Sequence, residues 1–432
     1  MKTHDRFFLA LLFCLSLHLP AVGQSDIDIS TTDTDSLNLD FINVYLDGAF
    51  FYQDYIKQEI TFVNYVRDRF KADVHVLMSG QSTGSGGVDY NIFLLGANRF
   101  AGKNDTLHYI AGTNDTDDEI RQGLTQVIKM GLLPYVAKVK TDLPITITYS
   151  GASTSTEKQE DDKWNGWVYS ISSYGNANIT ANVTSYYISG FLSAKKITED
   201  WKILANTGIN FNTDIFDLGD GEQFIGNNNS LNSNVTIVKS INDHWSVGGE
   251  AFHTSSTYSN YDNYFSVSPA IEYNVFPYSE NATRLLTIFY KIGPEYQDYT
   301  DTTLFGQTSA YLLRERLDIS LSLTQKWGTL AMGVNGSNYF HDLSKNGAGM
   351  FASFNWRIVE GLNFNGFITF DFINDQLNLA DGDLSDEEIL LQISEQQTNF
   401  SFFTYFGLSY TFGSIYNNVV NPRFEGGNSF FF

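Results

Sequence analysis

The sequence predicts a mainly β protein: an antiparallel transmembrane β-barrel of about 12 strands, preceded by a small α/β domain. Segments of about ten residues between positions 164 and 414 alternate apolar with small polar side chains, as strands facing lipid on one side do. The 35 Phe and 25 Tyr exceed what a soluble α/β enzyme usually carries. Beyond the N-terminus, no run of about 18 apolar residues could form a spanning helix. Because a bilayer satisfies no backbone group, strands cross it only as a closed barrel.

The first 23 residues are typical of a secretory signal peptide. Lys2 and Arg6 form a charged start, residues 7–19 are apolar, and small residues precede the expected cleavage point. A buried N-terminal helix is the alternative, and the flanking charges disfavour it. Cys14 is the only cysteine, so cleavage leaves a chain that can form neither disulfides nor cysteine–metal sites.

The net charge of −23 excludes the class of proteins that bind nucleic acid through a basic face. Acidic loops are the simplest explanation, and such loops could also hold divalent ions that bridge lipopolysaccharide. Asp115, Asp117 and Asp118 lack the glycine placement of a calcium loop, and they suit the positive end of a helix. We therefore expect no metal and no cofactor.

The change in pattern along the chain predicts six parts. They are a signal peptide (1–23), a disordered N-terminal linker (24–37), an α/β module (38–141), a second linker (142–163), the barrel (164–414) and a C-terminal tail (415–432).

The residue pattern of the module predicts two helices and at least three strands. Strands are expected at 43–46, 73–79 and 88–95, the last two joined across the glycines of 84–87, with helices over 54–69 and from 116 onward. Thr116 and Glu119 have the spacing of a capping box, which marks the start of the second helix.

The barrel strands follow from alternation; in one of them Leu362, Phe364 and Ile368 point one way while Asn363 and Thr369 point the other. The expected strands are 165–178, 184–197, 202–215, 232–241, 245–257, 264–276, 285–297, 311–325, 329–340, 347–358, 362–373 and 402–413.

The connections between these strands alternate in length. Those after even-numbered strands are short (198–200, 242–244, 325–328, 359–361), whereas 216–231, 298–310 and 374–401 are long. Outer-membrane barrels have short periplasmic turns and long external loops, so the module is expected in the periplasm. A capping box at Ser385 predicts a short helix in the longest loop, which either caps the mouth or lies on the surface.

Several short sequence segments resemble those of a group of uncharacterised Gram-negative outer-membrane β-barrel proteins. They are FVNYVRDR at 62–69, ADVH at 72–75, STGSGG at 82–87, YTFGS at 410–414 and NPRF at 421–424. The barrel half also resembles, loosely, the salt-induced outer-membrane proteins. The order of elements in the module is similar to the N-terminal domain of TolB in topology alone. The resemblance implies an outer-membrane location and brings no catalytic motif.

A belt of charged side chains is expected inside the barrel. By alternation these residues point inward from four consecutive strands: Glu250, Glu272, Lys291, Arg314, Arg316 and Asp318. Two interpretations are compatible with the belt: it selects a small polar solute, or its charges neutralise each other in a narrow bore. Glu315 falls on the lipid face by alternation. It would lie in the headgroup region, or a bulge would turn it inward.

Neither of the two catalytic motifs considered, a phosphate loop and a serine–histidine pair, is complete in this sequence. The glycines at 84–87 are not followed by the Lys and Ser/Thr of a phosphate loop. An outer-membrane phospholipase would need a serine and a histidine in contact on the outer wall. His253 and Ser255 share a face but, two apart on one strand, lie about 7 Å apart, and His341 belongs to a distant loop.

The leading functional hypothesis is a non-enzymatic outer-membrane barrel that anchors a periplasmic interaction module. Lys57, Arg67 and Arg69 are candidate contacts for a periplasmic protein partner. The alternatives are a narrow channel for small polar solutes and, less favoured, a phospholipase-like hydrolase. The expected surroundings are outer-membrane lipid, lipopolysaccharide and the outer-membrane assembly machinery, which would read the aromatic pattern of 406–412 or the tail ending at Phe432.

Overall fold

The computed structural model describes residues 41–48, 52–84, 86–139, 162–219, 222–382, 395–414, 416, 418 and 423. The predicted signal peptide (1–23) and N-terminal linker (24–37) lie outside the described residues, as do most of the second linker and most of the tail. The described chain contains a five-stranded sheet and a twelve-stranded sheet. No helix among the described residues has both the length and the apolar character needed to cross a membrane.

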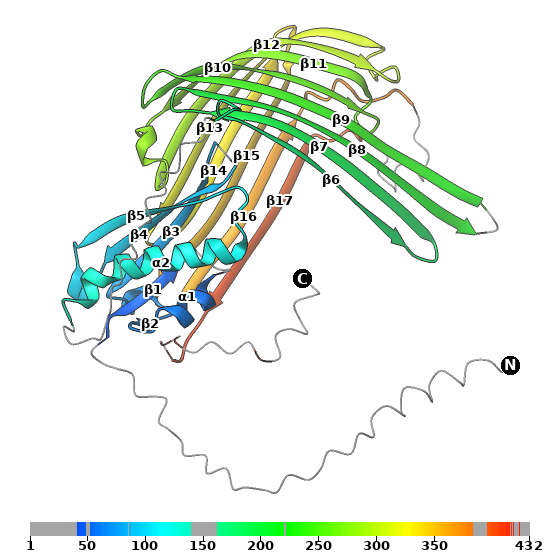
Figure 1. The fold of residues 1–432 in the computed structure, drawn as a ribbon. Coiled ribbons are helices and arrows are strands. Elements are labelled where there is room, and N and C mark those ends of the chain that lie inside the picture. Colours follow the sequence, from blue (N-terminus) through cyan, green and yellow to red (C-terminus); the bar gives the residue numbers. More distant parts are fainter. Residues whose placement is uncertain are drawn as a thin grey trace, which may run out of the picture. The chain divides into compact units, whose positions relative to one another are not determined.

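The five-stranded sheet belongs to the α/β module (Figure 1). Its elements are β1 Asn43–Asp47, α1 Gln53–Glu59, β2 Asn64–Tyr65, η1 Arg69–Lys71, β3 Val74–Ser82, β4 Val88–Gly96, η2 Asn98–Phe100, β5 Asn104–Ala111 and α2 Asp117–Val136. The strand order is β2-β1-β3-β4-β5, with β1 parallel to both neighbours and the other pairs antiparallel.

Both helices of the module pack on one face of this sheet. The buried core joins β1, β3 and β4 to α1 and α2 through Val44, Val74, Val76, Ile92, Leu94, Ile56, Leu124, Ile128 and Leu132. Burying each such side chain contributes about 1.5–3 kcal/mol. The predicted capping box starts α2: Glu119 N donates to Thr116 Oγ1, and Thr116 N donates to Glu119 Oε2.

Two details of the module differ from the sequence prediction. The helix expected over 54–69 ends at Glu59, because the backbone of Asn64 and Val66 bonds to the carbonyls of Ile42 and Val44 and continues the sheet. Strand β5 was not predicted, since its polar residues 104–106 hide the alternation that its second half shows. In both places the pairing of strands in the sheet, and not the local residue pattern, decided the secondary structure.

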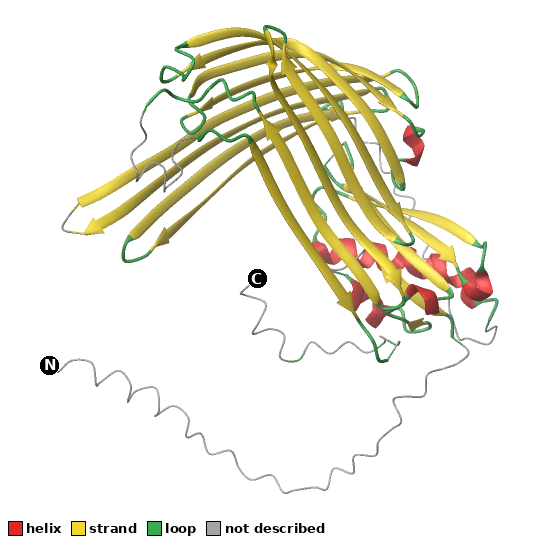
Figure 2. Cartoon of the chain, turned by 180° about the vertical axis from the view of Figure 1, so that it is seen from behind, coloured by secondary structure: helices red, strands yellow, loops and turns green. Residues whose placement is uncertain are grey.

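The twelve-stranded sheet runs in chain order, each strand antiparallel to its sequence neighbours (Figure 1). Its strands are β6 Trp167–Ile179, β7 Val183–Ile197, β8 Trp201–Gly219, β9 Glu222–Ser240, β10 Trp245–Ser256, β11 Tyr261–Asn274, β12 Arg284–Tyr299, β13 Ser309–Gln325, β14 Gly328–Tyr339, β15 Asp342–Val359, β16 Leu362–Ile373 and β17 Phe400–Tyr410. This is the meander of outer-membrane barrels, and all twelve predicted strands are confirmed. Figure 2 shows that the described helices lie almost entirely in the module.

The predicted short connections are confirmed, but the predicted difference between the two ends of the sheet is not: 180–182, 257–260 and 340–341 at the opposite end are also short, and 275–283 is long. Short turns join β7 to β8, β13 to β14 and β15 to β16. Gly361 in the last of them has φ +73°, and a side chain there would lie 2.2 Å from Thr411 O. The long loop expected at 216–231 was wrong: β8 and β9 continue as a ladder through most of it. Ladder hydrogen bonds need no apolar side chains, so the polar run 227–229 concealed the strand.

The sheet has two ends rather than a closed ladder. Strands β6 and β17 stand at the ends of the order, and no described residues of the two strands pair with each other. Tyr405 and Phe406 on β17, and Ile171 and Tyr174 on β6, are all exposed. The sequence predicted the strands, whereas the described residues contain no closing pair between β6 and β17.

Candidate functional site: the junction of module and sheet

The face of the module sheet turned away from its helices carries unexpected polar residues. Tyr45 and Asp47 on β1 alternate with the core residues Val44 and Leu46, and His75 lies beside Tyr45 in the parallel register. Asp47 is 7% exposed and His75 is 3% exposed. Buried ionisable groups need partners, and here a partner comes from the twelve-stranded sheet.

Arg357 supplies that partner. It is the last inward-facing residue of β15, and its Nη1 and Nη2 donate to Asp47 Oδ2 and Oδ1, each at 2.5 Å. His75 Nε2 lies 3.0 Å from the same Oδ2. The guanidinium also sits 5.2 Å from the centre of the Tyr45 ring, which contacts His75 edge-on. A bidentate, charge-assisted pair of this kind fixes both distance and orientation.

The electrostatics of the junction favour one protonation state. Burial alone would raise the pKa of Asp47, but hydrogen bonds from His75 and Arg357 outweigh it and hold that pKa at about 2. Burial lowers the pKa of His75, against the opposing effect of Asp47. Burial and the Asp47 charge together raise the pKa of Tyr45 to about 12. Near neutral pH the junction therefore holds an ionised Asp47 beside a neutral His75.

Residues 67–69 fasten the module at a second place. Arg69 Nη1 donates to Lys326 O at 2.7 Å, and its Nη2 donates to Arg357 O at 3.3 Å. Asp68 Oδ2 accepts from Gly361 N at 2.7 Å. Arg67 donates to two carbonyls directly after β17, those of Phe412 and Gly413, each at 3.0 Å.

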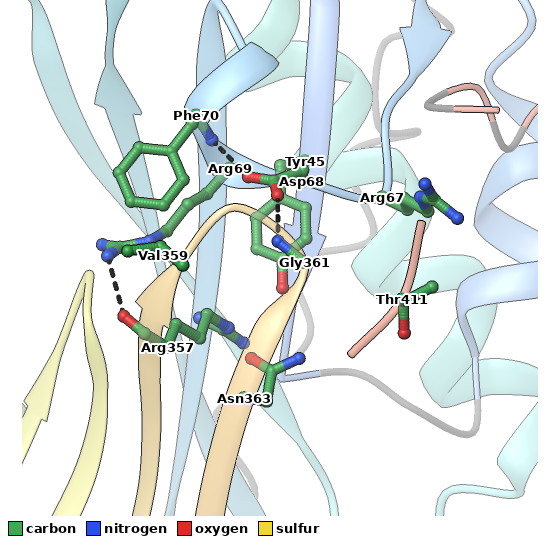
Figure 3. A pocket seen from close by; sticks show the side chains of 10 residues that line it. All are labelled: Tyr45, Arg67, Asp68, Arg69, Phe70, Arg357, Val359, Gly361, Asn363 and Thr411. Carbon is green, nitrogen blue, oxygen red and sulfur yellow. Dashed lines mark hydrogen bonds between the residues drawn. The ribbon is translucent and has the colours of Figure 1, made fainter. Parts of the chain in front are cut away.

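These residues surround a small open recess of about 200 Å³ (Figure 3). Arg67, Arg69 and Arg357 line it together with Tyr45 and Asp68. Because the Nη groups of all three arginines are already bonded to protein acceptors, the recess is organised as a joint between two parts of the chain.

Other contacts reach further around the same end of the sheet. Gln81 Nε2 donates to Asn281 Oδ1 at 3.0 Å, in the connection between β11 and β12. At Gly84 in the β3–β4 hairpin, a side chain would lie 2.9 Å from Ile197 O at the end of β7. From the tail, Tyr416 bridges to Val66 at the free edge of β2. The module thus lies at the end of the sheet where β7 turns into β8 and β15 turns into β16.

The candidate partner residues have other roles in this structure. Arg67 and Arg69 bind carbonyls of their own chain, and Lys57 is buried on α1, 3.7 Å from Asp54. Sequence reasoning missed Asp47, His75 and Arg357. A signal existed: Asp47 directly follows the apolar residues 44–46, and His75 interrupts the apolar run of 74–78.

The inward charges are brought together only in part. Lys291 Nζ donates to Glu250 Oε2 at 2.7 Å, and Arg316 donates three bonds to Asp318. Arg314 bonds instead to Asp375, at 2.5 Å, which the sequence analysis did not single out. Glu272 lines a separate recess together with Lys202.

The described parts of the longest loop lie over the other end of the sheet. Asn378 Nδ2 donates to Ser259 O and to Glu395 Oε2, and Asn260 Nδ2 donates to Asn378 O at 2.9 Å. Leu379 is buried there. The capping box at Ser385 lies outside the described residues, so that predicted helix stays a prediction.

Two single residues resolve sequence alternatives. Glu315 stays on the outer face, in unbroken register with Ile292, and accepts a hydrogen bond from Tyr290 at 2.6 Å rather than turning inward through a bulge. His253 Nε2 lies 3.2 Å from Asn263 Oδ1 and its ring stacks on Phe265, so its polar partner is an amide and not Ser255. Among the described residues, no group of three or more His, Cys, Asp or Glu is placed to hold a metal ion.

No protein-family model matches the sequence, and no curated protein matches it. Among solved structures, the NanC porin superposes with a TM-score of 0.28 at 12% identity, over 56% of this chain and 99% of the porin chain. The translocator domain of the autotransporter NalP from Neisseria meningitidis gives a TM-score of 0.17 at 12% identity, over 57% of this chain and 82% of that domain. Likenesses this distant identify no relative, and the fold assignment rests on the strand order and register.

Proposed function

We propose that the protein is a non-enzymatic outer-membrane β-barrel, closed by pairing of β6 with β17, that anchors its α/β module at the periplasmic end. The observation that carries this proposal is the junction itself. The module is fastened to the end of the sheet where β15 turns into β16 by a buried pair, Arg357 with Asp47, and by backbone bonds at residues 67–69.

The outer face of the sheet supports the membrane part of the proposal. Every strand exposes at least one large apolar side chain on the face opposite the inward charges: Ile171, Ile188, Ile209, Ile237, Val247, Val267, Ile288, Leu317, Val334, Met350, Phe370 and Phe406. A continuous apolar band around a meander is what lipid requires. Two unpaired edge strands would be costly in lipid, which favours their closure.

The helical side of the module supports the anchoring part. Because the opposite sheet face is occupied by the junction, the helices face away from the twelve-stranded sheet. Asp117, Asp118, Glu119 and Gln122 at the start of α2 are exposed. A periplasmic protein partner would therefore meet the helices and not the arginines at 67–69.

Cleavage of the linker at 142–163 tests anchoring directly. After a protease cuts this linker in the purified full-length protein, we expect the module to stay bound to the barrel during purification. Arg357→Ala should release it, because Asp47 is then buried without its main partner. The matched control is Arg284→Ala, which breaks an exposed pair with Glu280 and should release nothing. Release from the unmodified protein would overturn the anchoring proposal.

The same cleavage tests the side of the membrane. In intact cells, added protease should leave the linker whole, and it should cut the linker only after the outer membrane is permeabilised. Cutting in intact cells would place the module outside.

Introduced cysteines test closure. If residues 1–23 are removed as a signal peptide, the mature chain has no thiol, so a single pair is unambiguous. Ser173→Cys on β6 should crosslink to one of Thr404→Cys, Phe406→Cys or Leu408→Cys on β17, and to none of them if the edges stay apart.

A second function, a narrow channel, is favoured by the inward charges. Lys291 with Glu250, and Arg316 with Asp318, place ion pairs along the concave face. In planar bilayers we expect conductance steps that change with Lys291→Ala if the lumen conducts. A silent, folded barrel would leave anchoring as the only role of the two.

A further inference from the structure

We infer that the concave face of the sheet carries a binding site for a small, uncharged, hydroxyl-rich molecule of the sugar class, centred over Gly349. This site goes beyond the anchoring role and does not depend on it. It lies far along the strands from residues 67–69, toward the loops at 374–382 and 395–399.

The centre of the site is a notch in the sheet. One rung of the ladder runs Asp318, Asn335, Gly349, Asp371 across β13 to β16. A side-chain carbon at Gly349 would lie 2.7 Å from Asp371 Oδ1 and 2.9 Å from Asn335 Nδ2. The side chains of Asn335 and Asp371 therefore converge above a position that has no side chain of its own.

The two flanking groups are free to bind a ligand. Asn335 and Asp371 have no side-chain hydrogen bond to any residue in the described part of the chain. Their neighbours are engaged: Arg316 with Asp318, and Arg314 with Asp375 and Ser337. Asn335 is half-buried and Asp371 is exposed, so both side chains can be reached from the recess.

The chemistry of these groups selects the ligand class. Asp371 only accepts hydrogen bonds, whereas the Asn335 amide both donates and accepts. A hydroxyl also does both, so adjacent hydroxyls satisfy the two side chains together. An anion would face the Asp371 carboxylate, and a cation would leave the amide donor unused. Since the nearby arginines are already neutralised by their own aspartates, no free positive charge offsets this preference against anions.

A buried polar network holds one wall of the site rigid. Tyr299 donates to Gln297 Oε1 at 2.7 Å, and Gln297 Nε2 donates to Glu295 and to the Tyr339 hydroxyl. Gln297 is 0% exposed and Tyr339 is 3% exposed. Arg314 lies 5.1 Å from the centre of the Tyr339 ring. A wall that is already ordered costs a ligand little when it binds.

The recess has room for such a ligand. Its volume is about 390 Å³, and it is lined by Asn335 and Asp371, by Arg316 and Tyr339, and on the loop side by Gln376, Asn378 and Glu395. Small-molecule sites occupy about 300–1,000 Å³. The loop wall is held in place because Gln376 Nε2 and Asn378 Nδ2 donate to the Glu395 carboxylate, each at 2.8 Å.

Three sugars of one ring size test the ligand class. Calorimetry would use the refolded full-length mature protein in a detergent without a sugar headgroup, titrated with glucose, glucuronate and glucosamine. We expect glucose to bind about tenfold more tightly than either charged sugar. Equal or tighter binding of glucuronate or of glucosamine would overturn the proposal, as would no detectable binding of glucose at tens of millimolar.

Two glycines give a matched pair of variants. Gly349→Ala fills the notch and should weaken glucose binding about tenfold. Gly336→Ala adds the same methyl on β14, where nothing lies within 4 Å, and should leave the affinity unchanged. Equal effects of the two would overturn the proposal. If Gly349→Ala does not fold, Asp371→Asn, which keeps the shape and removes the charge, should also weaken binding about tenfold; unchanged affinity in that variant would overturn the proposal.

Discussion

Two aspartates, one in the module and one on the concave face of the twelve-stranded sheet, have opposite surroundings. Asp47 at the junction is buried and accepts from both an arginine and a histidine, whereas Asp371 in the recess has no side-chain partner among the described residues. The carboxylate is the same in both cases. The difference teaches that the junction is built to hold the module, while the recess keeps hydrogen-bonding capacity free for something else.

Among the substitutions that test this comparison, Asp47→Ala should have the largest effect. Arg357 and His75 would then be buried without their acceptor, and loss of one partner from a buried pair costs about 3–5 kcal/mol. We expect this loss in the free energy that keeps the module docked, measured by urea-dependent release of the module after the linker has been cut. Arg357→Ala should not add fully to it, since both changes remove the same interaction. Full additivity would show that the pair does not act as a unit.

Acid should weaken the junction in two steps. The lowered pKa of His75 means that the docked state resists its protonation, so stability begins to fall as pH drops below about 6.5. Asp47 has a pKa of about 2 in the folded protein against an ordinary 3.8, so its contribution is present above pH 3.8 and is lost as pH falls toward 2. That second loss is roughly 2 kcal/mol.

Release of the cut module between pH 7 and pH 2 would measure both steps. Asp68, Arg69, Arg357 and Tyr45 surround the pair, and His75→Gln should abolish the first step alone. A stability that is flat from pH 7 to pH 5 in the unmodified protein would contradict the role given to His75.

At the rim of the junction, Lys71→Ala should cost about 0.2–1 kcal/mol. Lys71 lies 3.3 Å from Glu360, but both side chains are roughly half exposed, so water and salt screen the pair. The same release assay would detect a larger loss. A cost near that of Asp47→Ala would mean that burial is not what distinguishes the two pairs.

The smallest expected effect is that of Asp371→Ala. Because this carboxylate has no partner within the described chain, removing it should change the stability of the barrel by no more than about 0.5 kcal/mol. Thermal unfolding in detergent would measure this change, with Asp318→Ala, which strips Arg316 of its partner, as the contrasting variant. A large loss with Asp371→Ala would show a structural role and remove the contrast with Asp47.

Local patterns in the sequence were sufficient for the twelve strands of the large sheet and for the start of α2. Alternation locates a strand without knowledge of its partner, and the spacing of Thr116 and Glu119 locates a helix start. The same reasoning failed where pairing decides. It continued the first helix past Glu59, missed β5, and treated most of 216–231 as a loop, since polar residues paired in a ladder carry no apolar period.

The sequence by itself determined twelve antiparallel strands, an α/β module in front of them and the set of side chains on the concave face, because each of these follows from residues close together in the chain. Tertiary structure decided the two sites. Asp47 and Arg357 are 310 positions apart, and Asn335, Gly349 and Asp371 meet only through the register of three strands. Register is set by hydrogen bonding and side-chain packing summed over whole strands, and no short stretch of residues encodes it.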